Sequence, residues 1–246
     1  MTQYIQTTLP DPAYRLTDGG VSGAGSYGPG FREVKLSSQS NTAVDRSNSG
    51  KVIARSNAFH QWNIDINYNP MTKAEFRPVS SFLMQKRGGL IPFFVDLPQY
   101  SLPENTYWNT FLNTSTMSPN STQVAGSTTI LISSNGTAYS PSSHGGPEPG
   151  EIFTITDNSF SNAYKVYMIT RVETSSDYAT NDSSNPGAGN IRLTITPGLE
   201  KAFTTSATLN FKNAKFRVIM PNDVFEYSLN TENLYSFSLK LEEALA

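Results

Sequence analysis

Three stretches of the chain alternate apolar and polar residues with a period of two, which is typical of a β-strand with one buried face. The apolar members are Trp62, Ile64, Ile66 and Tyr68 in the first stretch, Phe216, Val218 and Met220 in the second, and Tyr235, Phe237, Leu239 and Leu241 in the third. The first and third stretches lie far apart in the sequence. The pattern therefore predicts a β-rich domain built from both ends of the chain.

One helix is predicted, over residues 72–87. Thr72 and Glu75 have the spacing of a capping box, in which the glutamate satisfies a free backbone N–H at the helix start. Apolar residues follow at helical spacing, and Gly88 and Gly89 come directly after Lys86 and Arg87, as expected at a helix end. Pro78 lies inside this helix, where we expect a kink.

Further short strands are predicted beyond the helix. Leu90–Pro98 reads as a buried strand, and the middle of the chain offers four more candidates separated by loops rich in Ser, Asn, Gly and Pro. These candidates are Ser127–Ile132, Glu151–Thr156, Tyr164–Arg171 and Ile191–Thr196. Short strands between turn-rich loops favour a small sandwich or barrel.

The domain organisation follows from these elements. We expect a Gly/Ser-rich N-terminal arm with loops over residues 1–58, including a polar loop over residues 37–57. A discontinuous β domain is predicted from residues 59–105 and 204–246, with residues 106–203 inserted as a second β domain. Residues 101–200 carry three basic and eight acidic residues, so charge also changes at the predicted insertion.

Composition narrows the function classes. The 246 residues include no cysteine, which excludes disulfides, thiolate catalysis and zinc–thiolate sites. The net charge of −2 argues against a general nucleic-acid binder, which usually carries a basic excess. No apolar run reaches the length of a membrane helix, and no signal peptide is expected at the N-terminus.

Motifs that could support chemistry are weak. Gly23, Gly25 and Gly28 match a dinucleotide-binding pattern, but Pro29 and Gly30 follow at once, where the motif requires a helix. His60 and His144 lack the neighbours of a metal site or a nucleophile elbow.

Acidic and aromatic residues leave further alternatives open. Asp177–Asp182 lacks the spacing of a calcium loop, and Glu242 and Glu243 are expected to be solvated. Four aromatic residues in or near loops could form an interface or a sugar-binding platform. They are Tyr107, Trp108, Tyr139 and Tyr178.

The order of elements resembles the minor tail and distal tail proteins of tailed bacteriophages. The resemblance rests on the Trp62 strand, the capped helix ending in Arg87-Gly88-Gly89, the segment PFFVDLP, and the closing strand YSFSLKLEEAL. In the middle of the chain, PGEIFTITD, YKVYMITRV and IRLTITPGL are also similar to segments of that family. The resemblance implies a mainly β fold, in which a tail-tube-like β-sandwich or barrel with one α-helix carries an inserted small β-barrel or sandwich.

The resemblance also implies a function. The chain would be a structural virion protein, made in the host cytoplasm, that forms a homohexameric ring at the distal end of the tail. Its partners would be copies of itself, the tail tube protein and baseplate hub or tail tip proteins. DNA would only pass through the lumen, and neither cofactor, membrane insertion nor enzymatic activity is expected.

Interface residues are predicted in the arm and in the helix. They are Gly23, Tyr27, Phe31, Arg77, Lys86 and Arg87. A tail tube subunit and a carbohydrate- or receptor-binding tail module are the alternative functions, and a cell-wall glycosidase is a third.

Overall fold

The computed structural model describes residues 7–10, 31–157, 165–179, 181–222 and 224–244, with side chains 56–59 excepted. The chain divides into two compact units. Unit 1 comprises Met1–Val95 and Arg217–Ala244, and unit 2 comprises Asp96–Phe216 with Leu245–Ala246. The predicted candidates Gly23 and Tyr27, and the glycine-rich pattern around them, lie outside the described residues.

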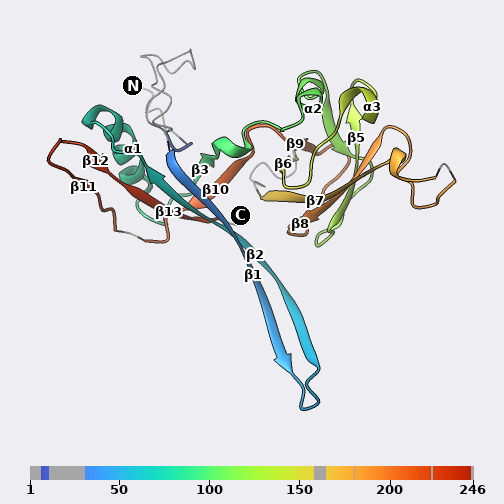
Figure 1. The fold of residues 1–246 in the computed structure, drawn as a ribbon, viewed down its shortest axis with the longest axis horizontal. Helices are drawn as coiled ribbons and strands as arrows, with labels where there is room; N and C mark the ends of the chain where they lie inside the picture. The colour runs from blue at the N-terminus through green and yellow to red at the C-terminus, as the bar shows by residue number, and fades with distance from the viewer. Residues whose placement is uncertain (1–6, 11–30, 158–164, 180, 223, 245–246) are drawn as a thin grey trace. The chain divides into compact units, whose positions relative to one another are not determined.

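Unit 1 is built on a five-stranded sheet with strand order β1-β2-β13-β10-β3 (Figure 1). The strands are β1 (Phe31–Arg46), β2 (Val52–Tyr68), β13 (Ser238–Glu243), β10 (Lys215–Ile219) and β3 (Phe93–Asp96). Strand β13 pairs antiparallel with β2 in a register that sets Leu241 opposite Ile64. The two ends of the chain therefore share one sheet, as the alternating stretches predicted.

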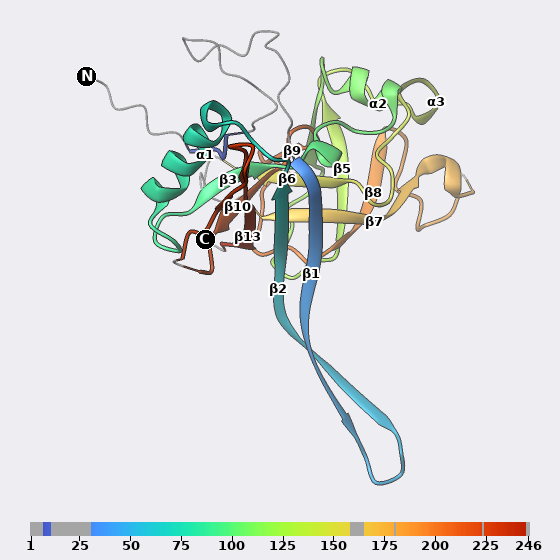
Figure 2. The same cartoon turned by 60° about the vertical axis from the view of Figure 1, so that its left-hand side comes forward.

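The predicted loop over residues 37–57 is wrong. Strands β1 and β2 pair antiparallel along most of their length, from Phe31 opposite Tyr68 to Arg46 opposite Val52, and form a long hairpin. Only Asn63–Asn67 of β2 also pair with β13, so the far half of the hairpin projects from the sheet as a two-stranded ribbon (Figure 2). A ribbon without a buried face needs no apolar alternation, which is why its sequence resembles a loop.

The helix α1 (Lys73–Lys86) confirms the predicted helix and runs through Pro78 without interruption. The Glu75 carboxylate accepts hydrogen bonds from the backbone N–H and the hydroxyl of Thr72, both at 2.9 Å. Phe76, Val79, Phe82 and Leu83 form the buried side of the helix. The Phe82 ring meets that of Phe93 edge-on, with ring centroids 5.3 Å apart. This contact packs α1 against strand β3 of the sheet.

A small hairpin of β11 (Ser228–Leu229) and β12 (Tyr235–Ser236) completes unit 1. The ring of Phe76 stacks on that of Tyr235 at 4.7 Å and lies 5.1 Å from that of Tyr227. The helix and the small hairpin thus share one aromatic cluster.

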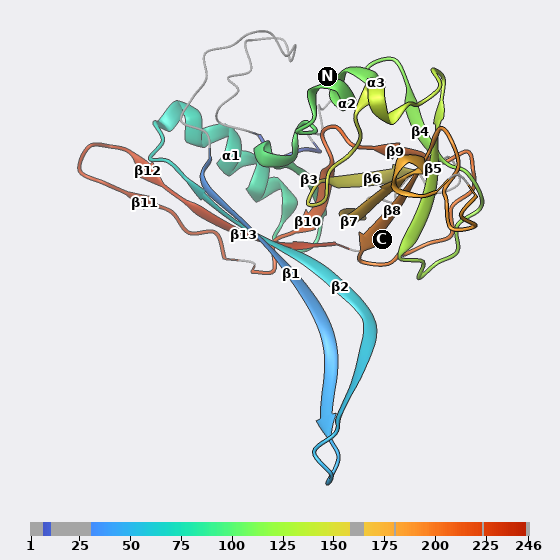
Figure 3. The same cartoon turned by 45° about the vertical axis from the view of Figure 1, so that its right-hand side comes forward.

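Unit 2 is a closed six-stranded barrel with order β4-β5-β8-β7-β6-β9 (Figure 3). Its strands are β4 (Thr116–Pro119), β5 (Thr129–Asn135), β8 (Asn190–Thr196), β7 (Val166–Thr174), β6 (Ile152–Thr156) and β9 (Thr208–Asn210). The four predicted strands of this region are confirmed as β5, β6, β7 and β8. Strands β4 and β9, which the sequence analysis missed, close the barrel.

Short helical segments accompany the barrel. They are α2 (Thr106–Phe111), α3 (Pro141–His144), and the single turns η1 (Pro98–Tyr100) and η2 (Ser175–Asp177). All are much shorter than α1, so the mainly β fold with one substantial helix is confirmed for the described residues.

Candidate assembly surfaces

As far as the described residues go, one edge of the unit 1 sheet is open. At the β3 edge, residues 7–9 are bound to Phe94: the Leu9 N–H donates to the Phe94 carbonyl at 2.8 Å and the Phe94 N–H donates to the Thr7 carbonyl at 2.9 Å. At the opposite edge, β1 pairs with β2 on one side, and within the described parts of the chain no strand pairs with its other side. An open edge strand presents backbone donors and acceptors that another chain can pair with.

The hairpin tip, defined here as residues 42–55, carries apolar side chains in solvent. Val44 and Val52 are 62% and 52% exposed, and the register places them on one face of the ribbon together with Ala54. Ile53, 56% exposed, lies on the other face. Exposed apolar side chains that gather on a ribbon otherwise rich in polar and charged residues are typical of a surface that another protein covers.

The turn Ser47–Lys51 holds this tip together and was the signal that the sequence analysis missed. The Ser47 N–H donates to the Lys51 carbonyl at 3.0 Å, and the Gly50 N–H donates to the Ser47 carbonyl at 2.8 Å. Gly50 has a φ of 78°, in the left-handed region that glycine adopts readily. A Ser/Asn/Gly turn between two short runs containing Val and Ile is a hairpin pattern.

The other predicted interface residues within the described parts of the chain differ in how far their side chains are exposed to solvent. Phe31 is half-buried, with its ring edge-on to Tyr68 at 5.3 Å, so it packs within its own sheet. Lys86 is buried, its ammonium lies 4.7 Å from the centre of the Phe82 ring, and burial lowers its pKa. Arg77 and Arg87 are exposed, so among the described candidates their side chains are the most open to a partner.

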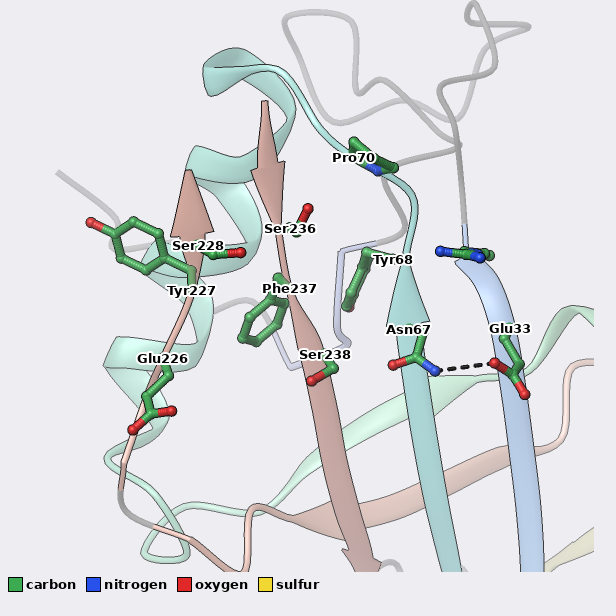
Figure 4. Close-up of a pocket in the computed structure, with 11 residues that line it drawn as sticks. Glu33, Asn67, Tyr68, Pro70, Glu226, Tyr227, Ser228, Ser236, Phe237 and Ser238 are labelled. Atoms are coloured by element: carbon green, nitrogen blue, oxygen red, sulfur yellow. Dashed lines mark hydrogen bonds between the residues drawn. The ribbon is translucent and has the colours of Figure 1, made fainter. Parts of the chain in front are cut away.

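A groove of about 630 Å³ lies beside the start of β1 and the small hairpin β11–β12 (Figure 4). The rings of Tyr68 and Phe237 stack at 5.5 Å within its wall, and the Asn67 side-chain amide donates to the Glu33 carboxylate at 3.2 Å. Tyr227 lies on the opposite side of the groove. Aromatic rings and short polar side chains suit a protein surface, and the described residues contain no cluster of three or more His, Asp or Glu that could hold a metal ion.

Both histidines take part in local packing. His60 is buried edge-on to Trp62 at 4.8 Å, and its Nε2 lies 2.9 Å from the Ser38 hydroxyl oxygen. His144 packs against the Phe111 ring at 4.5 Å, and its Nδ1 accepts the Ser140 N–H at 3.0 Å. Each ring thus has a structural role in its own unit.

The sugar platform considered for the loop aromatics is wrong for two of them. Trp108 and Tyr139 are buried in the barrel core. The Tyr139 hydroxyl donates to the Gly145 carbonyl at 2.6 Å, and burial together with the charge of Asp177 raises the pKa of Tyr139 to about 12. Tyr107 is 71% exposed, and the Tyr178 hydroxyl donates to the Glu173 carboxylate at 2.5 Å.

The acidic loop residues serve as local caps. The Asp177 carboxylate accepts the Thr174 N–H at 2.6 Å, and the Asp182 carboxylate accepts the Ser184 N–H at 2.8 Å. Glu243, expected in solvent, is buried: its carboxylate accepts the Trp62 N–H at 3.1 Å. Glu243 follows Leu239 and Leu241 on β13 with a period of two, so it lies on the buried face of the strand.

An open sheet edge, a projecting hairpin and a separate closed barrel define a mainly β protein whose described surfaces are suited to contacts with other proteins. Residues 9–100 match the family described as "Distal tail protein pb9, A domain, N-terminal". This range covers β1, β2, α1 and β3, and it confirms the resemblance to phage distal tail proteins. A comparison with the curated proteins found no match.

The match supports a structural role in a phage tail, and with it a location in the virion. In the described residues, no helix is long and apolar enough to span a membrane.

Proposed function

We propose that this chain forms a ring, with six copies, at the distal end of a phage tail, where it joins the tail tube to the baseplate or tail tip. The observation that supports this proposal most directly is the family match over residues 9–100, which covers three of the five strands of the unit 1 sheet, β1 with its open edge among them. A ring requires contacts between two different surfaces of each copy, repeated until they close.

The open edge and the hairpin tip provide one side of such a contact. Pairing of β1 with a strand of a neighbouring copy would satisfy its free backbone groups, and Val44 and Val52 would leave water at the same time. We further propose that unit 2 is a domain inserted into the tail-tube-like domain, and that it faces peripheral tail proteins. The chain is proposed to act without catalysis, cofactor or grip on the DNA that passes through the lumen.

Sedimentation velocity and negative-stain imaging of the purified full chain test the proposal. We expect a species of six times the mass of the 27.0 kDa chain, in the form of annular particles. A chain that remains monomeric over the accessible concentration range would contradict self-assembly into a ring.

The copy number in the particle separates the proposed ring from a tail tube subunit. A distal ring requires one or a few rings per tail, whereas a tube is built from dozens. Quantitative mass spectrometry of purified particles, with the capsid protein as reference, measures this ratio.

A further inference from the structure

The end of α1 carries an apolar groove that is open to solvent. Met84 and Val224 are 64% and 71% exposed, and they line a groove of about 260 Å³ together with the buried residue Leu83. Leu90, just after the helix, is 69% exposed. Apolar side chains gathered at one place, rather than scattered singly, indicate a surface that a partner covers.

Arg87 lies in the same groove with an unusual backbone conformation. Its φ of 52° is in the left-handed region, which is uncommon for residues other than glycine, and glycine is the usual residue at this position of a helix end. The side chain is exposed, and in the described parts of the chain it forms no ion pair. Arg87 thus occupies a position where a glycine would be less strained, and its exposed guanidinium is open to a partner. Met84, Arg87 and Val224 are called the basic groove below.

Unit 2 carries a groove of opposite character and similar size, about 240 Å³. Glu104, Glu148 and Glu151 line it, and Leu102, 57% exposed, lies beside them. The Glu151 carboxylate accepts the backbone N–H groups of Glu104 at 2.8 Å and Glu148 at 3.1 Å, which fixes it in the groove wall. Among the described residues that line this acidic groove, as it is called below, there is no lysine or arginine.

The acidic groove disfavours the ionised form of Glu151. Burial raises the pKa of Glu151, and the neighbouring charges of Glu148 and Glu104 raise it further, while the two backbone hydrogen bonds act in the opposite direction. A cation that entered the groove would relieve this repulsion.

We propose that the basic groove of one copy binds the acidic groove of the next copy, with the Arg87 guanidinium between the carboxylates of Glu104 and Glu148. Met84 and Val224 then cover Leu102. The proposal rests on the proposed self-assembly and names one contact that holds the copies together. The two grooves belong to different units of the chain, so the contact is head-to-tail and can repeat around a ring.

Arginine suits this role better than lysine. Its planar guanidinium donates two parallel hydrogen bonds to a carboxylate and retains less water than an ammonium group. Removing one partner of a charge pair that is buried in a contact is costly, because the other charge is left unpaired away from water, whereas removing one partner of an exposed pair costs little.

Site-directed cross-linking tests whether the two grooves meet. The chain has no cysteine, so Met84→Cys and Leu102→Cys each introduce a single thiol. We expect a short bis-maleimide to join a mixture of the two variants into dimers that contain one copy of each, and to convert the double variant into a ladder of oligomers. The matched control replaces Met84→Cys by Lys73→Cys, an exposed position at the other end of the same helix, and should give neither product.

Charge reversal tests whether the ion pair stabilises the contact. Arg87→Glu and Glu148→Arg should each weaken association at least about tenfold, because like charges then face each other. The double variant Arg87→Glu, Glu148→Arg restores opposite charges and should recover most of the lost association, whereas Lys73→Glu should leave it unchanged.

The outcomes separate this contact from the proposed function. If the unchanged chain forms oligomers but the cysteine variants give no Met84–Leu102 cross-link, the contact is overturned and self-assembly stands. The same holds if Arg87→Glu chains associate normally. A chain that stays monomeric would refute both.

Discussion

The Glu243 carboxylate accepts the backbone N–H of Trp62 at 3.1 Å, across 181 residues of sequence. Trp62 lies on β2 and Glu243 ends β13, and both are buried. The hydrogen bond therefore holds the last strand of the chain against the strand that carries the long hairpin.

Loss of this hydrogen bond should destabilise unit 1. We expect Glu243→Ala to lower the free energy of unfolding by about 1–3 kcal/mol, because a buried donor loses its acceptor. Glu243→Gln keeps an acceptor oxygen and should cost less. Urea unfolding followed by tryptophan fluorescence measures both, and equal effects of the two variants would argue against the hydrogen bond as the cause.

The hairpin tip should contribute to association rather than to the stability of the single chain. Val44→Thr with Val52→Thr keeps the β-branched shape but removes apolar surface. Association should therefore weaken, so that oligomers form only at a higher protein concentration. The free energy of unfolding of the monomer should change by no more than about 0.5 kcal/mol, as for other exposed sites. Sedimentation velocity and urea unfolding separate the two effects, and a large loss of monomer stability would show that the tip belongs to a core.

Tyr139 should make the barrel sensitive to alkaline pH. Its pKa is raised to about 12, so the folded state holds the phenol proton more tightly than the unfolded chain, whose tyrosines ionise near pH 10. The stability that this difference provides is complete below pH 10 and is lost as the pH rises towards 12. Urea unfolding at a series of pH values should show a smaller loss for Tyr139→Phe than for the unchanged chain.

At neutral pH the same variant should be less stable, by about 1 kcal/mol, because the Gly145 carbonyl loses the hydroxyl that donates to it at 2.6 Å. Tyr107→Phe is the control, since that side chain is exposed. Identical pH profiles of the three proteins would contradict the assigned role of Tyr139.

Arg87→Gly should raise stability and weaken association at once. Glycine adopts the φ of 52° without the cost that a side chain adds, so the free energy of unfolding should rise by up to about 1 kcal/mol. The same variant removes the Arg87 guanidinium, which is the cation of the basic groove. Thermal unfolding and sedimentation velocity give the two readouts, and a variant that is stabilised without weaker association would count against a role of Arg87 in binding.

The sequence by itself determined those elements that bury one face. Ile64 and Ile66 alternate with polar residues because β2 lies over the core there, and Thr72, Glu75 and Gly88 mark the ends of α1 through local backbone chemistry. These signals act within a few residues, so they can be read without knowing the fold. They sufficed to predict the helix, the mainly β class and most of the strands, but not β1, β4, β9 or β11.

Only the tertiary structure decided the remaining features. The hairpin tip has no core beneath it, so Val44 and Val52 leave no periodic signal, and only the register shows that they share a face. Trp108 and Tyr139 lie near loops in the sequence, yet both are buried in the core of unit 2, where the Trp108 ring meets that of Tyr139 edge-on at 5.8 Å. Glu104 and Glu151 are 47 residues apart and meet only because the chain returns to the same groove. Burial and charge proximity depend on such long-range contacts, which the local order of residues does not encode.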